Sequence, residues 1–361
     1  MEAEKIGFIE KLLIKLNKPK LDNKVAFYRL LAVTQNAGLG IRDSLDAILN
    51  GEQHPGMRKI VDDLISQTSQ GTSLADAMEN HAYFFGHEEI ALVKSAETMG
   101  NLPDVLQNLS DELENFQQIK GKLKSALMYP SVVLVFTAIA VVILLIYVMP
   151  TMVDMFPSEE DLPGITLFMM GASDFLQDYW FLVLLGVISL GVGYKMAYTY
   201  LLPFKIFMDK VFLKAPIVGN LTRSFNLYRF SKLLGDFYNA GVGPTDALEQ
   251  ISEILSNYHY STKIKNVKND LSLGLGFVES MEGSWLFDPI LIQIIGIGEN
   301  TGNVGEVLEK ISSFYRDNLD QSVEGLMKAL EPLIMAFVAI VVGVIVASIF
   351  LPMGELIGTI G

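Results

Sequence analysis

The sequence predicts an all-α membrane protein with two repeated cytoplasmic helical-bundle domains and three transmembrane helices. Two observations predict this class: long apolar segments without charge, and a pattern of residues that occurs twice along the chain. Half of the 361 residues are hydrophobic, 19% are charged, and the charges are absent from particular segments. A chain of this length also favours several structural units over one ordinary core.

The apolar segments predict the three spans. No Asp, Glu, Lys or Arg occurs in residues 126–153 or 332–354, and each run exceeds the roughly 20 residues that cross a bilayer as a helix. A third stretch contains one charge, Lys195, whose long stem can carry the ammonium group to the lipid headgroups. We therefore expect transmembrane helices at 126–150, 179–204 and 330–353. For the third stretch, a buried helix of a soluble domain is the alternative.

Basic residues predict the orientation of these spans. Between residues 126 and 180 there is no Lys or Arg, whereas six acids lie there. Basic residues instead flank the opposite ends of the spans: Lys120, Lys122, Lys124, Lys205, Lys210, Lys214, Arg316 and Lys328. By the positive-inside rule these ends face the cytoplasm. The expected order is a lead-in (1–24), a first cytoplasmic domain (25–125), a span (126–150), a periplasmic segment (151–178), a span (179–204), a second cytoplasmic domain (205–329), a span (330–353) and a periplasmic tail (354–361).

Composition excludes several classes of function. The net charge of −14 argues against nucleic-acid binding. The chain has no Cys, so neither disulfides nor thiolate chemistry is expected. The first residues include acids and lack the apolar core of a cleavable signal peptide, so no signal peptide is expected. The apolar residues of this segment are spaced as on one face of a helix, which could lie on a membrane or a partner, or be solvated: Ile6, Ile9, Leu13 and Leu16.

The internal repeat decides the architecture. The stretch QNAGLGIRDSLDAI, residues 35–48, returns as YNAGVGPTDALEQI, residues 238–251. Ten identities lie 203 residues apart, and after the loss of one residue the matches continue 202 residues apart. The extra middle span allows both copies to remain on one side of the bilayer. These repeats run parallel, unlike the inverted repeats of many transporters.

Glycines in the repeat predict tight corners between helices. Gly38 and Gly241 follow a helical face and can adopt the left-handed C-cap conformation. Gly100 and Gly302 predict a second corner, after which a helix continues into a span. We expect prolines at the cytoplasmic mouths of the spans, Pro130 and Pro332.

Two features near the second corner differ between the copies or have two interpretations. Ser73 and Asp76 form a capping-box-like helix start, but the second copy has Gly276 in place of the serine, which leaves its cap in doubt. Glu97 and Glu299 both lie just before the corner glycine. They could bond to loop amides or basic neighbours, or they could form a partner-binding surface or a cation site.

Catalytic motifs are absent from the sequence. There is no phosphate-binding G-x-x-x-x-G-K-[ST] loop, no H-E-x-x-H and no G-x-S-x-G. The uncharged runs of the first and third spans, 126–153 and 332–354, carry no Asp, Glu, Lys, Arg or His that would serve a polar substrate or a proton path. We therefore expect neither catalysis nor a cofactor. Instead, we expect a helical protein whose role is to dock with partners.

Taken in order, these motifs resemble those of the GspF/PilC family of inner-membrane platform proteins from bacterial type II secretion and type IV pilus machines. The resemblance covers about residues 25–355 and rests on QNAGLGIRDSLDAI, GTSLADAM, SAETMGNLPDVL, ALMYP and LPGIT in the first half, and on YNAGVGPTDALEQI, IGIGENTGNVGEVL and LEPLIMAFVAIVVGVIVASIFLPM in the second. It implies two cytoplasmic six-helix-type domains and three spans.

The resemblance also implies a function and partners. A platform of this family transmits the motion of a hexameric cytoplasmic ATPase to pilins or pseudopilins in the membrane, is not an enzyme, works beside other inner-membrane assembly proteins and acts as a homo-oligomer. A short lead-in favours a type IVb-like pilus machine over a type II secretion system. We expect the partner-binding residues to be Arg42, Asp43, Glu97, Asn101, Asp246, Glu299 and Asn303. The alternatives from other classes are a transporter or channel subunit and a membrane enzyme with a carboxylate metal site.

Overall fold

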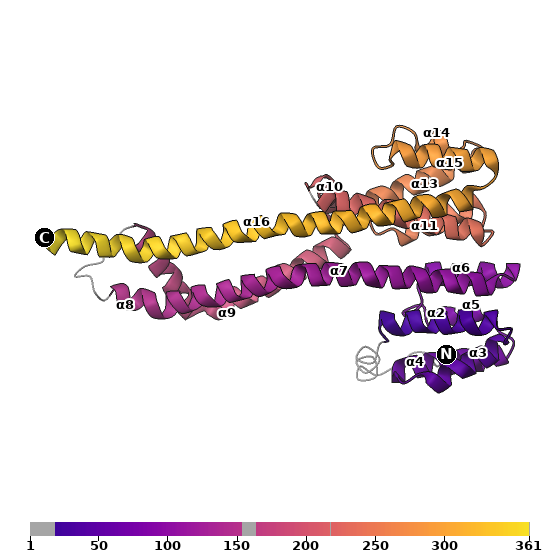
Figure 1. Ribbon diagram of the computed structural model, residues 1–361, viewed down its shortest axis with the longest axis horizontal. Helices are drawn as coiled ribbons and strands as arrows, with labels where there is room; N and C mark the ends of the chain where they lie inside the picture. The colour runs from indigo at the N-terminus through magenta and orange to yellow at the C-terminus, as the bar shows by residue number, and fades with distance from the viewer. Residues whose placement is uncertain (1–18, 154–163, 217, 361) are drawn as a thin grey trace. The chain divides into compact units, whose positions relative to one another are not determined.

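The computed structural model of the chain describes residues 19–153, 164–216 and 218–360, with side chains described up to Thr151 in the first range and Leu351 in the last. The described residues contain helices and no strand (Figure 1). They divide into two compact units, the first comprising Met1–Gly121 with Gly219–Asp320 and the second Lys122–Val218 with Gln321–Gly361. Both repeats therefore belong to the first unit, apart from the helices that leave them.

Each repeat contributes six helices in the same order. In the first repeat these are α2 (Leu21–Asn36), α3 (Ile41–Gly51), α4 (Pro55–Ser69), α5 (Leu74–Glu79), α6 (His87–Met99) and α7 (Leu102–Ile143). In the second they are α11 (Val218–Asn239), α12 (Pro244–Ile254), α13 (Tyr258–Ser272), α14 (Phe277–Met281), α15 (Pro289–Thr301) and α16 (Val304–Ile360). The repeat seen in the sequence is thus a repeat of six-helix modules.

Aromatic side chains hold each module together at equivalent positions. Phe27 and Phe85 lie with ring centroids 5.5 Å apart, and both side chains are buried. Phe230 and Phe287 repeat this contact at 5.2 Å. Such aromatic pairs bury a large apolar area and have preferred relative geometries. The two modules therefore share the anchor of their cores.

The predicted glycine corners are confirmed. Gly38, Gly100, Gly241 and Gly302 all have positive φ, between 70° and 85°. At Gly100 and Gly302 this left-handed residue is itself the C-cap of α6 and α15. A residue with a Cβ would be strained in this conformation, which explains why glycine recurs at the corners.

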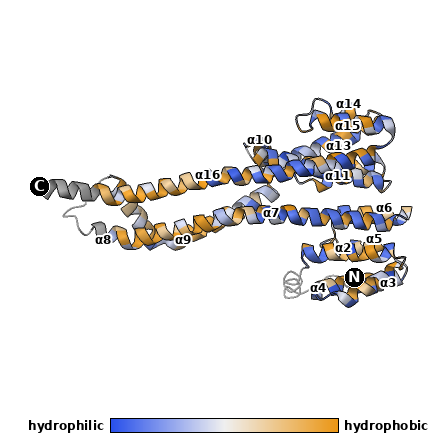
Figure 2. Cartoon of the chain, viewed as in Figure 1, coloured by the Kyte–Doolittle hydropathy of each residue, from blue (hydrophilic) through white to orange (hydrophobic). Residues whose placement is uncertain are grey.

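Among the described residues, three helices are long and apolar enough to cross a membrane. They are Leu102–Thr151, Gly164–Tyr200 and Val304–Leu351, and Figure 2 shows hydrophobic residues along α9 and the later parts of α7 and α16. Large apolar side chains in these segments are exposed, as expected of side chains that contact lipid. Pro130 and Pro332 lie inside α7 and α16, and their place at the cytoplasmic mouths of the spans stays a prediction.

The helix that contains the middle span has other bounds than the sequence predicted. Helix α9 runs over Gly164–Tyr200 and therefore begins within the segment 151–178, which we expected to be periplasmic. Its backbone is non-helical at Tyr179, where the span was expected to start. Helix α10 (Leu202–Lys214) follows, with Pro203 in its first turn. A proline inside a helix has no N–H to bond the carbonyl four residues before it and clashes with that carbonyl, so α9 does not continue through Pro203 and ends at Tyr200, before residue 204.

The first part of α9 forms because it has a surface to pack against. Met169 is buried in a cluster with Leu145, Met149 and Ile345 in the second unit. Residues 144–148 form a single π-helical segment, η1 (Leu144–Val148), just before α8 (Met149–Val153). A π-turn leaves a carbonyl outside the regular ladder, and Ser173 donates a hydrogen bond to the carbonyl of Leu145 at 2.6 Å.

The predictions for the two ends of the chain can be compared with the structure only in part. Residues 1–18, with the apolar stripe of the lead-in, lie outside the described residues. Residues 354–360, expected as a tail, continue α16 as a helix. Where the membrane boundaries fall along these helices remains a prediction.

Candidate functional site

The candidate site is the first unit, where the corners of the two repeats meet. At the N-terminus of α5, the carboxylate of Glu97 accepts the backbone N–H groups of Leu74 and Ala75, at 2.7 and 2.9 Å. The first turn of a helix leaves such N–H groups without partners inside the helix. Ser73 caps the same turn by accepting the N–H of Asp76 at 3.1 Å. Glu97 is therefore bonded to backbone amides at the start of α5, which is close to the first of its two interpretations.

The second repeat keeps the glutamate and loses the serine. Glu299 accepts the N–H of Phe277 at 2.9 Å, while the N-cap, Gly276, offers no side chain to α14. A negative charge is favourable at a helix N-terminus, because the helix dipole is positive there. The doubt about the cap of this helix is thereby resolved: the carboxylate replaces the missing hydroxyl.

The other predicted partner-binding residues have few internal contacts. Arg42 and Asp43 lie in the first turn of α3, exposed, and the guanidinium of Arg42 is 3.9 Å from the carboxylate of Asp46. Asp246 is exposed in the first turn of α12. Asn303 is exposed and donates to Glu306 at 3.0 Å. These side chains remain accessible to a partner.

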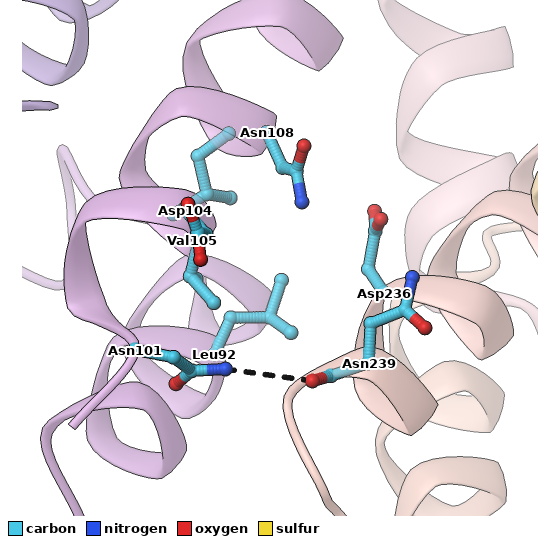
Figure 3. Close-up of a pocket in the computed structure, with 8 residues that line it drawn as sticks. Leu92, Asn101, Asp104, Val105, Asn108, Asp236 and Asn239 are labelled. Atoms are coloured by element: carbon cyan, nitrogen blue, oxygen red, sulfur yellow. Dashed lines mark hydrogen bonds between the residues drawn. The ribbon is translucent and has the colours of Figure 1, made fainter. Parts of the chain in front are cut away.

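Asn101 is half-buried and connects the two repeats. Its amide nitrogen donates to the carbonyl of Asn239 at 3.4 Å, a long hydrogen bond (Figure 3). Nearby, the hydroxyl of Ser95 donates to the carbonyl of Ala240 at 2.6 Å. The corner between α6 and α7 is thus bonded to the corner between α11 and α12.

Gly241 marks the closest approach at this contact. A Cβ on this residue would lie 1.9 Å from the terminal methyl of Met99. The equivalent glycine of the first repeat, Gly38, has no such neighbour within 4 Å. Both need a left-handed backbone, and at Gly241 a Cβ would also displace the end of the flexible Met99 side chain, which is 55% exposed.

Charged groups line the rest of the contact. The guanidinium of Arg229 on α11 bonds Glu88 on α6 at 2.6 Å, and both side chains are largely buried. Arg316 on α16 donates to Asn115 on α7 at 3.2 Å. Arginine suits such sites because its planar donor group is always charged and weakly hydrated.

Two acids approach each other across the contact. Burial raises the pKa of Glu112 on α7 to about 8, and repulsion by Asp236 and Glu88 adds to the effect, while Lys232 and Arg229 oppose it. Burial also raises the pKa of Asp236, against the 2.7 Å ion pair that it forms with Lys232. A proton shared between the two carboxyl groups would reduce their repulsion.

A small cavity lies between the same elements. Its volume is about 140 Å³, and Figure 3 shows Asp104 and Asn108 on the α7 side and Asp236 and Asn239 on the α11 side. The lining also includes Asn101, whose amide oxygen is buried without a hydrogen-bond partner. A polar space of this size suits a few water molecules. No group of three or more His, Cys, Asp and Glu that could hold a metal occurs among the described residues.

Comparison with known proteins gives the family. The family described as Type II secretion system (T2SS), protein F, matches residues 27–150 and again 230–352. These two segments are the two repeats, each with the span that follows it. The chain belongs to this family.

Relatives of this family member come from both kinds of machine. The type IV pilus assembly protein PilC of Pseudomonas aeruginosa is 31% identical over 93% of this chain and 90% of its own length. PilC of Myxococcus xanthus is 30% identical over 93% of this chain and 81% of its own. The type II secretion system protein F of Vibrio cholerae is 25% identical over 91% of this chain and 81% of its own.

Sequence reasoning missed most residues of the contact between the repeats. In this family member the contact depends on Glu88, Ser95 and Met99 on one side and on Arg229 and Asp236 on the other. None of these residues is identical in the other copy, although Ser95 and Met99 lie within the stretch SAETMGNLPDVL. The signal in the sequence was a difference between the copies and not a shared motif. Residues at equivalent positions differ when the same helix faces different surroundings in the two repeats.

Proposed function

We propose that the chain is an inner-membrane assembly platform that couples a cytoplasmic ATPase to pilins or pseudopilins. The observation that carries this is the family match to both repeats in a chain that also has three helices able to span a membrane. The basic residues beside the spans support a cytoplasmic position for both modules.

A type IV pilus machine is the system that we favour. Several relatives are named for type IV pilus assembly, and the match to PilC of Pseudomonas aeruginosa covers most of both chains. The type IVb-like assignment remains a prediction. Relatives named type II secretion system protein F keep that system as the alternative.

The ATPase would dock on the exposed corners of the modules. Glu97 and Glu299 are poor probes of docking, because charge reversal there would also remove a helix cap. Arg42, on the exposed first turn of α3, avoids this problem. We expect Arg42→Glu to abolish pilus assembly and ATPase binding while the protein remains in the membrane and keeps the mass distribution of the wild type after detergent extraction. Lys59→Glu, the same charge change at an exposed site on α4, is the control.

Asp43 and Asp246 extend this test to the same corner in both repeats. Assembly that proceeds normally in Arg42→Glu, Asp43→Lys and Asp246→Lys would reject docking at these corners. The family assignment would survive that result, because it depends on none of these three residues. Reporter fusions in 25–125 and 205–329 test the shared orientation separately: activity on opposite sides of the membrane would reject it.

The membrane helices offer a groove for a pilin or pseudopilin helix. Within the second unit, α7 and α16 line a cavity of about 450 Å³ with a mainly apolar lining. Tyr129 and Ile334 contribute to it, and Lys328 and Glu331 place charged groups there as well. An apolar groove with a few polar groups suits a hydrophobic helix that carries an occasional polar side chain.

A photo-crosslinker tests this groove. We expect a benzophenone amino acid at Tyr129 to label the major pilin in cells, and one at Leu190 on α9 to label it much less. Both side chains are exposed in the structure, at 65% and 75%, so access alone does not distinguish them. Equal labelling from both positions would reject the groove as the pilin site.

A further inference from the structure

The contact between the repeats joins two different faces, so each chain leaves one face of each kind uncovered. The first repeat contributes its α6/α7 face, represented by Glu88, Ser95 and Glu112. The second contributes its α11/α12 face, represented by Arg229 and Ala240. Each of these faces has an equivalent in the other repeat that the internal contact does not cover. These two free faces are the α15/α16 face of the second repeat and the α2/α3 face of the first.

The free α15/α16 face is apolar where its equivalent is polar. Following the 202-residue spacing of the repeats, Glu88, Ser95 and Glu112 correspond in order to three hydrophobic residues: Ile290, Ile297 and Phe314. Their side chains are exposed by 52%, 57% and 45%. Exposed large hydrophobic residues that lie together on one face mark interaction sites more often than isolated ones do.

The free α2/α3 face has changed in the same direction. With the 203-residue spacing, Arg229 corresponds to Ala26, and Asp236 corresponds to Val33, which is 56% exposed. Leu233 is fully buried on α11, whereas its equivalent on α2, Leu30, is 47% exposed. The same helix surface is therefore covered in one repeat and open in the other.

The substitutions are matched between the two free faces. Where the internal contact pairs Arg229 with Glu88, the free faces offer Ala26 and Ile290. Where two acids approach each other internally, the free faces offer an apolar residue on both sides. A charge lost on only one face would leave its partner unpaired in a contact, at a large cost in free energy. Loss on both faces preserves complementarity.

We propose that the α15/α16 face of one copy docks on the α2/α3 face of a second copy of this chain. The second copy is the occupant because its face has the geometry that the same elements already join within one chain. Gly38 is open on this face, just as Gly241 would be without Met99. The inference concerns the repeats alone and does not depend on which machine the chain serves.

This contact is heterologous, so it has a consequence for assembly. A face that binds a different face leaves both ends of a dimer open, and the assembly continues until a ring closes or a chain of subunits extends. Copies in one membrane share an orientation, which restricts closed assemblies to rings about the membrane normal. A two-fold contact between identical faces is a different arrangement, and cross-linking separates the two.

Cysteine cross-linking tests the proposal in membranes, since the chain has no cysteine of its own. Ser95 and Ala240 form the internal contact, and the equivalent pair on the free faces is Ile297 and Ala37. We expect the double variant Ala37→Cys with Ile297→Cys to give dimers and higher species on oxidation. The control double variant, Ser95→Cys with Ala240→Cys, should give a cross-linked monomer.

Single-cysteine variants determine which faces meet. Ala37→Cys and Ile297→Cys should each give little dimer alone, and their co-expression should give dimers without higher species, because each chain then has one reactive face. Dimers from Ile297→Cys alone would overturn the proposal in favour of identical faces. A cross-linked monomer only, or no product while the internal control reacts, would also overturn it.

A second measurement does not depend on cysteine chemistry. We expect Phe314→Asp to shift the chain toward the monomer by at least tenfold in concentration, measured by mass photometry after detergent extraction. The matched control is Leu273→Asp, since this side chain is 82% exposed after α13, outside both free faces. An unchanged mass distribution in Phe314→Asp, or an equal shift in the control, would contradict the proposed contact.

Discussion

The two capping glutamates predict a difference in local stability between the repeats. Glu97 accepts two backbone N–H groups and Glu299 accepts one. A hydrogen bond to a charged group contributes about 1.5–3 kcal/mol. Because Glu97 is partly exposed, water can replace some of the loss, and we take the lower value for each bond. Glu97→Ala should then cost about 3 kcal/mol and Glu299→Ala about 1.5 kcal/mol of local stability.

Hydrogen exchange measures this cost where it occurs. A loss of about 3 kcal/mol corresponds to exchange roughly a hundredfold faster, and half that loss to roughly tenfold. The amides of α5 should therefore respond more strongly to Glu97→Ala than those of α14 to Glu299→Ala. Glu97→Gln keeps one neutral acceptor and should give an intermediate effect.

The control for this experiment is an acid on α5 itself. Glu79 approaches Lys94 only at 4.0 Å, and the structure assigns it no backbone N–H, so Glu79→Ala should leave the α5 amides protected. Unchanged exchange at Leu74 and Ala75 in Glu97→Ala would refute the capping role. If exchange is unchanged and assembly fails, Glu97 binds a partner and does not cap α5.

Three further substitutions test other contacts. Gly241→Ala and Gly38→Ala place a Cβ on a left-handed backbone, which costs about 1–2 kcal/mol each, but only Gly241→Ala should weaken the contact between the repeats, because a methionine packs there; equal effects on domain docking, measured by limited proteolysis, would contradict this. Glu112, with its pKa raised to about 8, holds a proton in the folded protein between about pH 4.5 and 8 that the unfolded chain releases, so stability should fall as pH rises through this window. Denaturation of Glu112→Gln at pH 5, 7 and 9 should show a flatter profile, and a slope equal to that of the wild type would refute the assignment. Ser173→Ala removes the bond to the carbonyl of Leu145 and should cost about 1 kcal/mol in a steric-trapping or denaturant assay, whereas no loss relative to another α9 serine would show that the bond contributes little.

Features governed by local chemistry could be predicted from the sequence. The glycine corners follow from the left-handed conformation, which few other residues adopt readily. The spans follow from the length of the uncharged runs. Both features depend on neighbouring residues only. The repeat strengthened the prediction of the corners, because Gly100 and Gly302 occur at the same position of the two copies and both have a positive φ.

Features governed by distant contacts could not be predicted. The start of α9 depends on Met169, which packs against residues elsewhere in the second unit. Likewise, Asn101 was chosen as a partner-binding residue because it recurs at a corner, but the structure shows it bonded to the other repeat. Its equivalent, Asn303, is exposed. A corner that occurs in both repeats of the sequence does not reveal which of its two copies contacts the other repeat.

The interiors of the modules show how far the repeats can diverge without a change of fold. In the first repeat, Glu89 is buried and accepts from both Lys24 and Tyr28 at 2.7 Å; burial raises its pKa and the two donors oppose the rise. At the positions of the ion pair the second repeat has Leu227 and Leu291, both buried. A fully paired buried ion pair and well-packed leucines can be nearly equal in stability, whereas one member alone is costly. Both members of such a pair are therefore expected to change together, in the module cores and on the faces alike. We expect the apolar pairs on the free faces to have arisen under the same constraint, the cost of an unpaired charge.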